Sequence, residues 1–132
     1  MKRILPALLL AACTAPAALA GSAAPLLAAL EADASRQAGA PLSGSPSRGD
    51  TFFHTRRAEW SCSSCHTADP RQTGRHVVTG KNIRPMAPAV NPDRFVDRAK
   101  TDKWFRRNCQ DVLGRPCSLQ EQADVVAYLA SL

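Results

Sequence analysis

Aromatic side chains are scarce in this 132-residue chain, which contains four Phe, two Trp and one Tyr. A hydrophobic share of 45% with a net charge of only +6 excludes an intrinsically disordered protein. The length fits one domain. A core with so few large side chains is small, and burying a further bulky apolar group would stabilise it. No segment shows sustained alternation of polar and apolar residues, so we expect an all-α protein without strands.

Long hydrophobic runs are also missing, which excludes a membrane span. The first apolar run, residues 4–12, follows Lys2 and Arg3, and a small-x-small site ends at Ala20. This order is typical of a secretory signal peptide. We therefore predict a signal peptide over residues 1–20, and a single mature domain over residues 21–132 in the periplasm.

One alternative for the N-terminus is lipidation. Residues 10–13 resemble a lipoprotein box, which would place a lipid on Cys13. We rank this reading second, because the apolar run before Cys13 is very short and a conventional cleavage site follows it. Without Cys13 the chain keeps four cysteines, an even number that suits an oxidising compartment.

Periodicity and capping residues predict short helices joined by loops. The expected helices cover residues 25–37, 47–54, 92–99, 102–113 and 119–131. The fourth would begin after Thr101 as N-cap, and the last after a capping box formed by Ser118 and Glu121. Residues 39–49 are expected to be a linker. Residues 67–92 contain four prolines and are expected to be mostly loop.

The most informative motif is Cys62-Ser63-Ser64-Cys65-His66, which is C-x-x-C-H, the attachment signature of c-type haem. Two cysteines at this spacing each form a thioether with one haem vinyl group, and the next residue places its imidazole beneath the iron. Export agrees with this interpretation. We predict one covalent haem c, bound through Cys62 and Cys65, with His66 as the proximal iron ligand.

Two other readings of the cysteines are weaker. A thioredoxin-type redox pair requires a βαβ context, which the pattern does not contain. A zinc site requires two more ligands, and Cys109 and Cys117 would have to supply them. An oxidising compartment favours pairing of those two cysteines instead.

The sixth iron ligand decides the function, and the residues alone leave it open. Met86 is the only methionine after removal of the signal peptide, and a thioether there would make an ordinary electron carrier. His54 and His76 are further candidates for ligation. They are also the only histidines that would serve as acid–base groups if the protein were an enzyme, such as a peroxidase or a nitric-oxide-detoxifying protein.

Beyond the haem motif, several short motifs occur in a specific combination. They are Gly80-Lys81-Asn82-Ile83, Pro92-Asp93-Arg94-Phe95, Lys103-Trp104-Phe105-Arg106-Arg107-Asn108-Cys109 and Gly114-Arg115-Pro116-Cys117. In this combination the chain resembles the sphaeroides haem protein family of high-spin, oxygen-binding c-type cytochromes. The resemblance extends over essentially the whole mature chain, and it implies a small class I cytochrome c-like fold.

The resemblance also implies roles for particular residues. Asn108 would be the sixth ligand, Cys109 and Cys117 would form a disulfide, and a dihaem or other c-type cytochrome would donate electrons. A neutral amide is a weak-field donor, so it would leave the iron high-spin and give way to oxygen or nitric oxide after reduction. The disulfide at Cys117 would limit the motion of the segment that carries Asn108.

The remaining charges allow two readings. Six cations crowd one region: Arg94, Arg98, Lys100, Lys103, Arg106 and Arg107. They would form either a solvated helix face or a docking surface for an acidic redox partner. The charge is too small, and too little interleaved with aromatics, for a nucleic-acid-binding protein. Lys81, Arg84 and the Trp104 N–H are candidate partners of the haem propionates.

Overall fold

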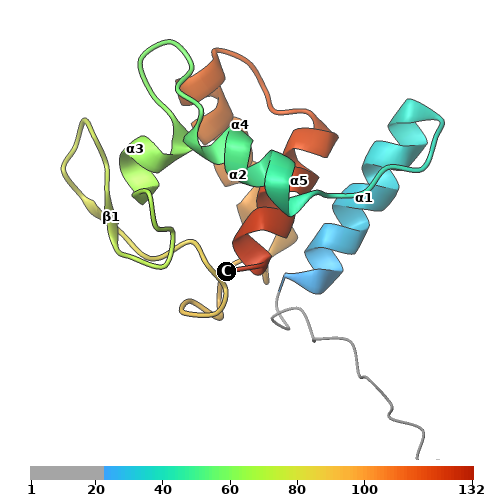
Figure 1. Ribbon diagram of the computed structural model, residues 1–132, viewed down its shortest axis with the longest axis horizontal. Coiled ribbons are helices and arrows are strands. Elements are labelled where there is room, and N and C mark those ends of the chain that lie inside the picture. The colour runs from blue at the N-terminus through green and yellow to red at the C-terminus, as the bar shows by residue number, and fades with distance from the viewer. Residues whose placement is uncertain (1–22) are drawn as a thin grey trace, which may run out of the picture.

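The computed structural model describes residues 23–132, so the predicted signal peptide and Cys13 lie outside the described residues. Five helices and one small hairpin follow one another along the chain (Figure 1). Their bounds are α1 (Ala24–Ala38), α2 (Pro46–His54), α3 (Cys62–His66), β1 (Gly74–Arg75), β2 (Asn82–Ile83), α4 (Arg98–Leu113) and α5 (Leu119–Ala130). No helix within this part of the chain has the length and apolar character needed to traverse a bilayer.

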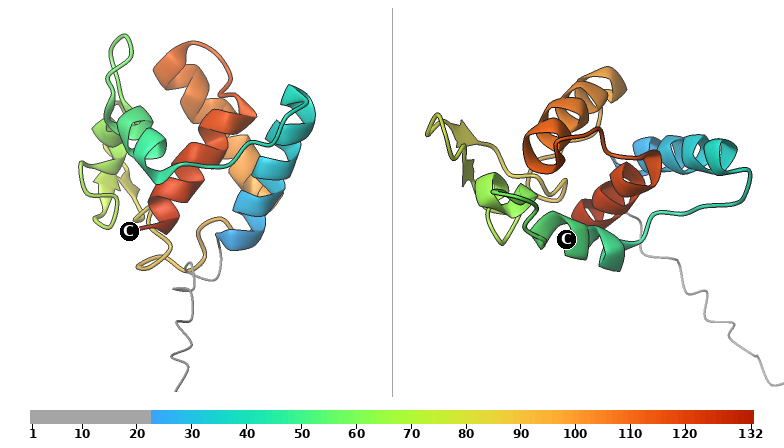
Figure 2. Two further views of the ribbon diagram at one scale, coloured as in Figure 1. Left: turned by 45° about the vertical axis from the view of Figure 1, so that its right-hand side comes forward. Right: turned by 90° about the horizontal axis from the view of Figure 1, so that it is seen from above.

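The core is centred on α5, in which every residue from 123 to 130 is buried. Helices α1 and α2 both pack on it, with Leu30, Phe53 and Leu129 among its fully buried side chains. In Figure 2, α4 and α2 lie on opposite sides of α5. Helix α3 and the hairpin lie at the end of the molecule away from α1 (Figure 1).

Helix α2 begins earlier than the sequence predicted, so the expected linker over residues 39–49 ends at Ser45. The Ser45 side chain caps the helix, and Pro46 suits its first turn. Gly49 is buried against α5, where a Cβ would lie 2.0 Å from the carbonyl oxygen of Asp124. This glycine therefore marks a close helix–helix contact and does not belong to a loop.

A buried carboxylate holds the start of α2 against α5. Asp124 is only 5% exposed, and it accepts hydrogen bonds from the Ser45 amide, the Arg48 guanidinium and the Gln120 amide group. A buried charge is tolerated only when it is paired and hydrogen-bonded, as here. The bonds fix α2, and with it the segment that leads into α3.

The helix predicted over residues 92–99 is absent, and that prediction was wrong. Residues 92–96 form turns, in which Phe95 has a φ of 70°, outside the helical region. The Asn91 side chain donates to the Pro85 carbonyl at 2.7 Å. Helix α4 accordingly starts at Arg98, with Asp97 and not Thr101 as its N-cap, because the Asp97 carboxylate accepts from the Lys100 amide.

Two short strands correct the expectation that the chain has none. Strands β1 and β2 pair antiparallel, with Gly74 opposite Ile83 and Arg75 opposite Asn82. Elements of two residues are too short to produce an alternating pattern. Hydrogen bonds in the connecting turn hold the hairpin, including one from Arg75 Nε to the Gly80 carbonyl at 2.9 Å.

Three connections attach α4 to the rest of the molecule. Arg98 forms ion pairs with Asp33 of α1 and Asp102 of its own helix, and Phe105 packs against the core. The disulfide between Cys109 and Cys117 joins α4 to the segment before α5. The expected pairing of these cysteines is thus present, and Gly114 ends the helix as predicted.

Candidate haem-attachment site

The C-x-x-C-H motif forms a helix of its own, α3. The Ser61 side chain accepts from the Ser64 amide and the Ser64 side chain accepts from the Ser61 amide, so a reciprocal capping box starts the helix. Cys62 and Cys65 are not joined in a disulfide. Burial raises the pKa of the Cys62 thiol to about 11, so this side chain is a neutral thiol at neutral pH.

His66 has the properties of a metal ligand. Burial lowers its pKa to about 4, with smaller contributions from the charges of Arg94 and His76, so its imidazole is neutral and has a free lone pair at neutral pH. The Phe53 ring lies 6.2 Å from the His66 ring, centroid to centroid. The Nδ1 atom of His66 is buried without a hydrogen-bond partner among the described residues. A buried polar atom without a partner at the end of this motif fits a site built for a further group.

The segment after His66 closes tightly on α3. Gly74 of β1 lies so near that a Cβ there would come within 2.2 Å of the Cys65 carbonyl oxygen. Further on, the Pro70 carbonyl accepts from the amides of Met86 and Ala87. The loop predicted over residues 67–92 is therefore held to the attachment helix by backbone contacts.

The alternative sixth ligands are engaged elsewhere. Met86 is half-buried and packs against the hydrophobic core. Nδ1 of His54 lies 3.0 Å from an oxygen of Asp50, and its Nε2 lies 3.1 Å from the Ala68 carbonyl oxygen. Nδ1 of His76 accepts from two backbone amides of the hairpin turn. The two histidines thus hold backbone segments in place, and neither is presented as an acid–base group.

Asn108 lies on α4, half-buried, immediately before the disulfide-bonded Cys109. Trp104 lies one turn earlier on the same side of the helix and is 45% exposed. The Arg107 guanidinium lies over the Trp104 ring, 5.8 Å from its centre. The structure therefore places the predicted distal ligand on a helix separate from α3, in a segment that the disulfide restrains.

Of the basic side chains near the site, Arg94 is the most buried. Its Nη2 donates to the carbonyls of Arg84 and Pro85, at 3.2 and 3.3 Å. Burial and the charge of Arg84 lower its pKa. Lys81 and Arg84, the predicted propionate partners, are exposed, and Arg84 pairs with Asp93. Arg94 was expected only as one of six clustered cations, and its position near His66 was not predicted, although its place in the Pro92–Phe95 motif was a signal for it.

These residues fit a covalently bound haem c. They supply two cysteines outside any disulfide and a neutral, half-buried histidine on one short helix. An arginine whose charge acts on that histidine lies nearby. The group would be attached through Cys62 and Cys65, with His66 on one side of the iron. This donor set does not need the disulfide cysteines, which disfavours the zinc reading.

The chain is similar to known c-type cytochromes. Residues 40–129 match a family model described as a domain of unknown function, DUF1924. The cytochrome c-type protein SHP of Cereibacter sphaeroides is 42% identical over 131 residues, which cover 94% of this chain and 96% of that protein. Cytochrome c″ of Methylophilus methylotrophus is 48% identical over 71 residues, 54% of this chain and 49% of that protein.

Solved structures give the same result. The structure of oxidised SHP, described as an oxygen-binding cytochrome c, superimposes with a TM-score of 0.69 at 40% identity, covering 80% of this chain and 96% of that one. The crystal structure of oxidised cytochrome c″ gives a TM-score of 0.74 at 36% identity, covering 83% and 94%. The expected helical cytochrome c-like fold is therefore confirmed. With this fold, this attachment helix and this relative, the chain belongs to the SHP family of c-type cytochromes.

Proposed function

We propose that this protein is a gas-binding c-type cytochrome of the periplasm that carries one covalent haem. The single observation behind the proposal is the site on α3, where a neutral His66 with a buried, unpartnered Nδ1 follows the cysteine pair, in a chain 42% identical to SHP. When bound, the haem would supply an iron that exchanges one electron and binds a diatomic gas in its reduced state.

With haem bound, His66 would hold the iron on one side and Asn108 of α4 on the other. The Asn108 amide is a neutral and weak donor, so oxygen or nitric oxide would displace it readily. Its two N–H groups would then be available as hydrogen-bond donors. The disulfide at Cys109 would limit how far the Asn108 segment moves. Met86 packs against the core and would take no part in gas binding.

Two substitutions test the assignment of the distal ligand on the haem-loaded protein. Asn108→His introduces a stronger-field imidazole, so we expect a low-spin optical spectrum and gas binding slowed by about tenfold or more. Met86→Leu, the matched control, should leave both the spectrum and the rate unchanged. A far-red methionine–iron charge-transfer band in the wild type that disappears in Met86→Leu would refute the proposal and favour an ordinary electron carrier.

Electrons would reach the haem from another c-type cytochrome, a dihaem protein being the expected donor.

Export is part of the proposal, because haem c is attached after translocation. N-terminal sequencing of the mature protein from a periplasmic extract should start at Gly21. A lipid-modified Cys13 would instead identify a membrane-anchored lipoprotein.

A further inference from the structure

The outer face of α4 carries a cluster of exposed cations. Lys100, Lys103, Arg106 and Arg107, here called the α4 cationic face, are spaced so that they share the side of the helix opposite Phe105 and Cys109. Within residues 23–132 none of the four forms an ion pair with a carboxylate. Their charges are therefore displayed to the solvent.

Most of the neighbouring carboxylates make other contacts. Asp102 and Asp33 pair with Arg98 on the inner side of α4, and Asp93 pairs with Arg84. Asp97 caps the helix by accepting from the Lys100 amide. Asp111, one turn after Arg107, is the exception, because it is exposed beside the two arginines. Four cations against this one carboxylate leave the face with an excess of positive charge.

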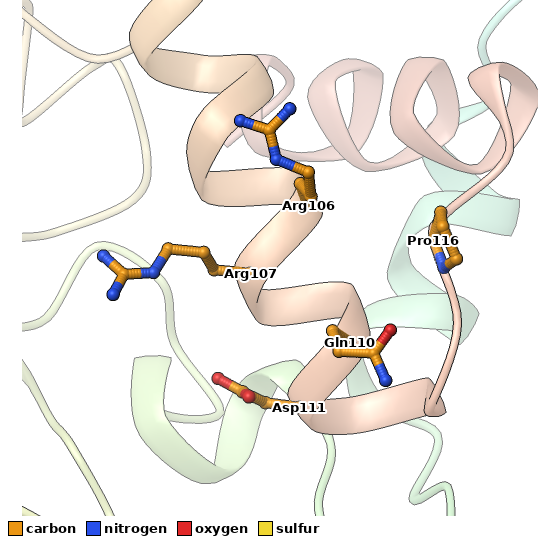
Figure 3. A pocket seen from close by; sticks show the side chains of 5 residues that line it. All are labelled: Arg106, Arg107, Gln110, Asp111 and Pro116. Atoms are coloured by element: carbon orange, nitrogen blue, oxygen red, sulfur yellow. The ribbon is translucent and has the colours of Figure 1, made fainter.

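The α4 cationic face also includes a pocket. Arg106 and Arg107 line a shallow pocket of about 400 Å³ together with Gln110, Asp111 and Pro116. In Figure 3 the Arg107 side chain extends away from the helix, whereas that of Arg106 runs up along the preceding turn. The Arg107 guanidinium lies over the Trp104 ring, 5.8 Å from its centre, a contact that favours this position of the charge.

We propose that the α4 cationic face is the docking surface for an acidic protein that donates one electron to this cytochrome. The proposal rests on the proposed function. Arginine is enriched at protein interfaces, and complementary charge mainly accelerates encounter and selects the partner. Because Arg107 directly precedes Asn108, a partner on this face lies against the helix that carries the proposed distal ligand.

The test measures electron transfer from reduced plant-type ferredoxin, an acidic one-electron donor, to the oxidised haem-loaded protein by stopped flow. One electron leaves the iron–sulfur cluster and reduces the ferric haem. No bond is made or broken. At low ionic strength, Lys103→Glu and Arg107→Glu should each lower the second-order rate constant by about tenfold. The difference from wild type should shrink at high salt.

Arg56→Glu is the matched control, since Arg56 is exposed, forms no ion pair within residues 23–132 and lies outside α4, and its reversal changes the net charge equally. We expect it to have little effect. An equal loss of rate in Arg56→Glu would overturn the proposal, because only net charge would then matter. Co-flotation of the wild type with phosphatidylglycerol vesicles, lost in Lys103→Glu, would also overturn it in favour of a membrane surface.

A failure of this proposal is distinguishable from a failure of the proposed function. Gas binding after chemical reduction with dithionite should be the same in wild type and in all three variants. If the wild type binds no gas after dithionite, the proposed function fails. If gas binding is intact and the ferredoxin rate is the same in every variant, only the docking surface is refuted.

Discussion

The three histidines show how local hydrogen bonds separate candidates that look alike in the sequence. His54 contacts Asp50 and the Ala68 carbonyl oxygen, and His76 accepts from backbone amides of its turn. Only His66 has a buried ring nitrogen that lacks a partner among the described residues. The C-x-x-C-H motif pointed to His66 in advance, whereas the roles of the other two follow from the backbone groups and the carboxylate that their rings contact.

Gly49 offers a test of packing at a single residue. In Gly49→Ala the new Cβ would lie 2.0 Å from the Asp124 carbonyl oxygen, so α2 and α5 must separate. We expect this substitution to lower the free energy of unfolding by about 1–3 kcal/mol. Denaturation in urea measures the effect. The control Ser47→Ala, at an exposed position of the same helix, should be close to neutral, and equal losses in both variants would contradict this account.

At the scale of elements, the starts of the helices were partly predictable. Ser118 and Glu121 form the capping box that their spacing indicated. The start of α4 was misplaced because Asp97, Thr101 and Asp102 all resemble helix-starting residues. The hydrogen bond from the Lys100 amide shows that Asp97 is the cap. The positive φ of Phe95 excludes the separate helix that was expected over residues 92–99.

The capping box of α5 also predicts a dependence of stability on pH. The bonds from Arg115, with smaller contributions from Ser118, lower the pKa of Glu121. A lowered pKa in the folded state stabilises the protein above the ordinary pKa of the carboxyl. This stability is lost as the pH falls through the folded-state value. The loss of stability on acidification should therefore be smaller in Glu121→Gln than in the wild type.

The capping box formed by Ser118 and Glu121 is also tested by removing the Ser118 hydroxyl. Ser118→Ala leaves the Glu121 amide without its side-chain acceptor, so we expect a loss of about 1 kcal/mol in the free energy of unfolding at neutral pH. Ser43→Ala is a suitable control, because Ser43 is exposed and accepts hydrogen bonds through its carbonyl. A neutral Ser118→Ala would show that α5 is held by packing alone.

At the scale of the whole molecule, the disulfide connects α4 to the core helix α5. Cys109 and Cys117 are separated by eight positions, and closing a loop of this size contributes about 2–3 kcal/mol in the chain-entropy model. Cys117→Ser should lower the free energy of unfolding by this amount. If the disulfide also restrains Asn108, the kinetics of gas binding should change in this variant. Unchanged kinetics would limit the disulfide to a role in stability.

The sequence by itself predicted the haem attachment residues and determined the helical class. Glycines marked the ends of α1 and α4, and the Ser118–Glu121 box marked the start of α5. These signals are local, since each depends on residues within a few positions of one another. Only the tertiary structure decided that Met86 packs against the core, that Arg94 acts on His66 and that four cations of α4 have no ion pair among the described residues. Those outcomes depend on which distant segments meet, and a residue's type does not specify its partners across the fold.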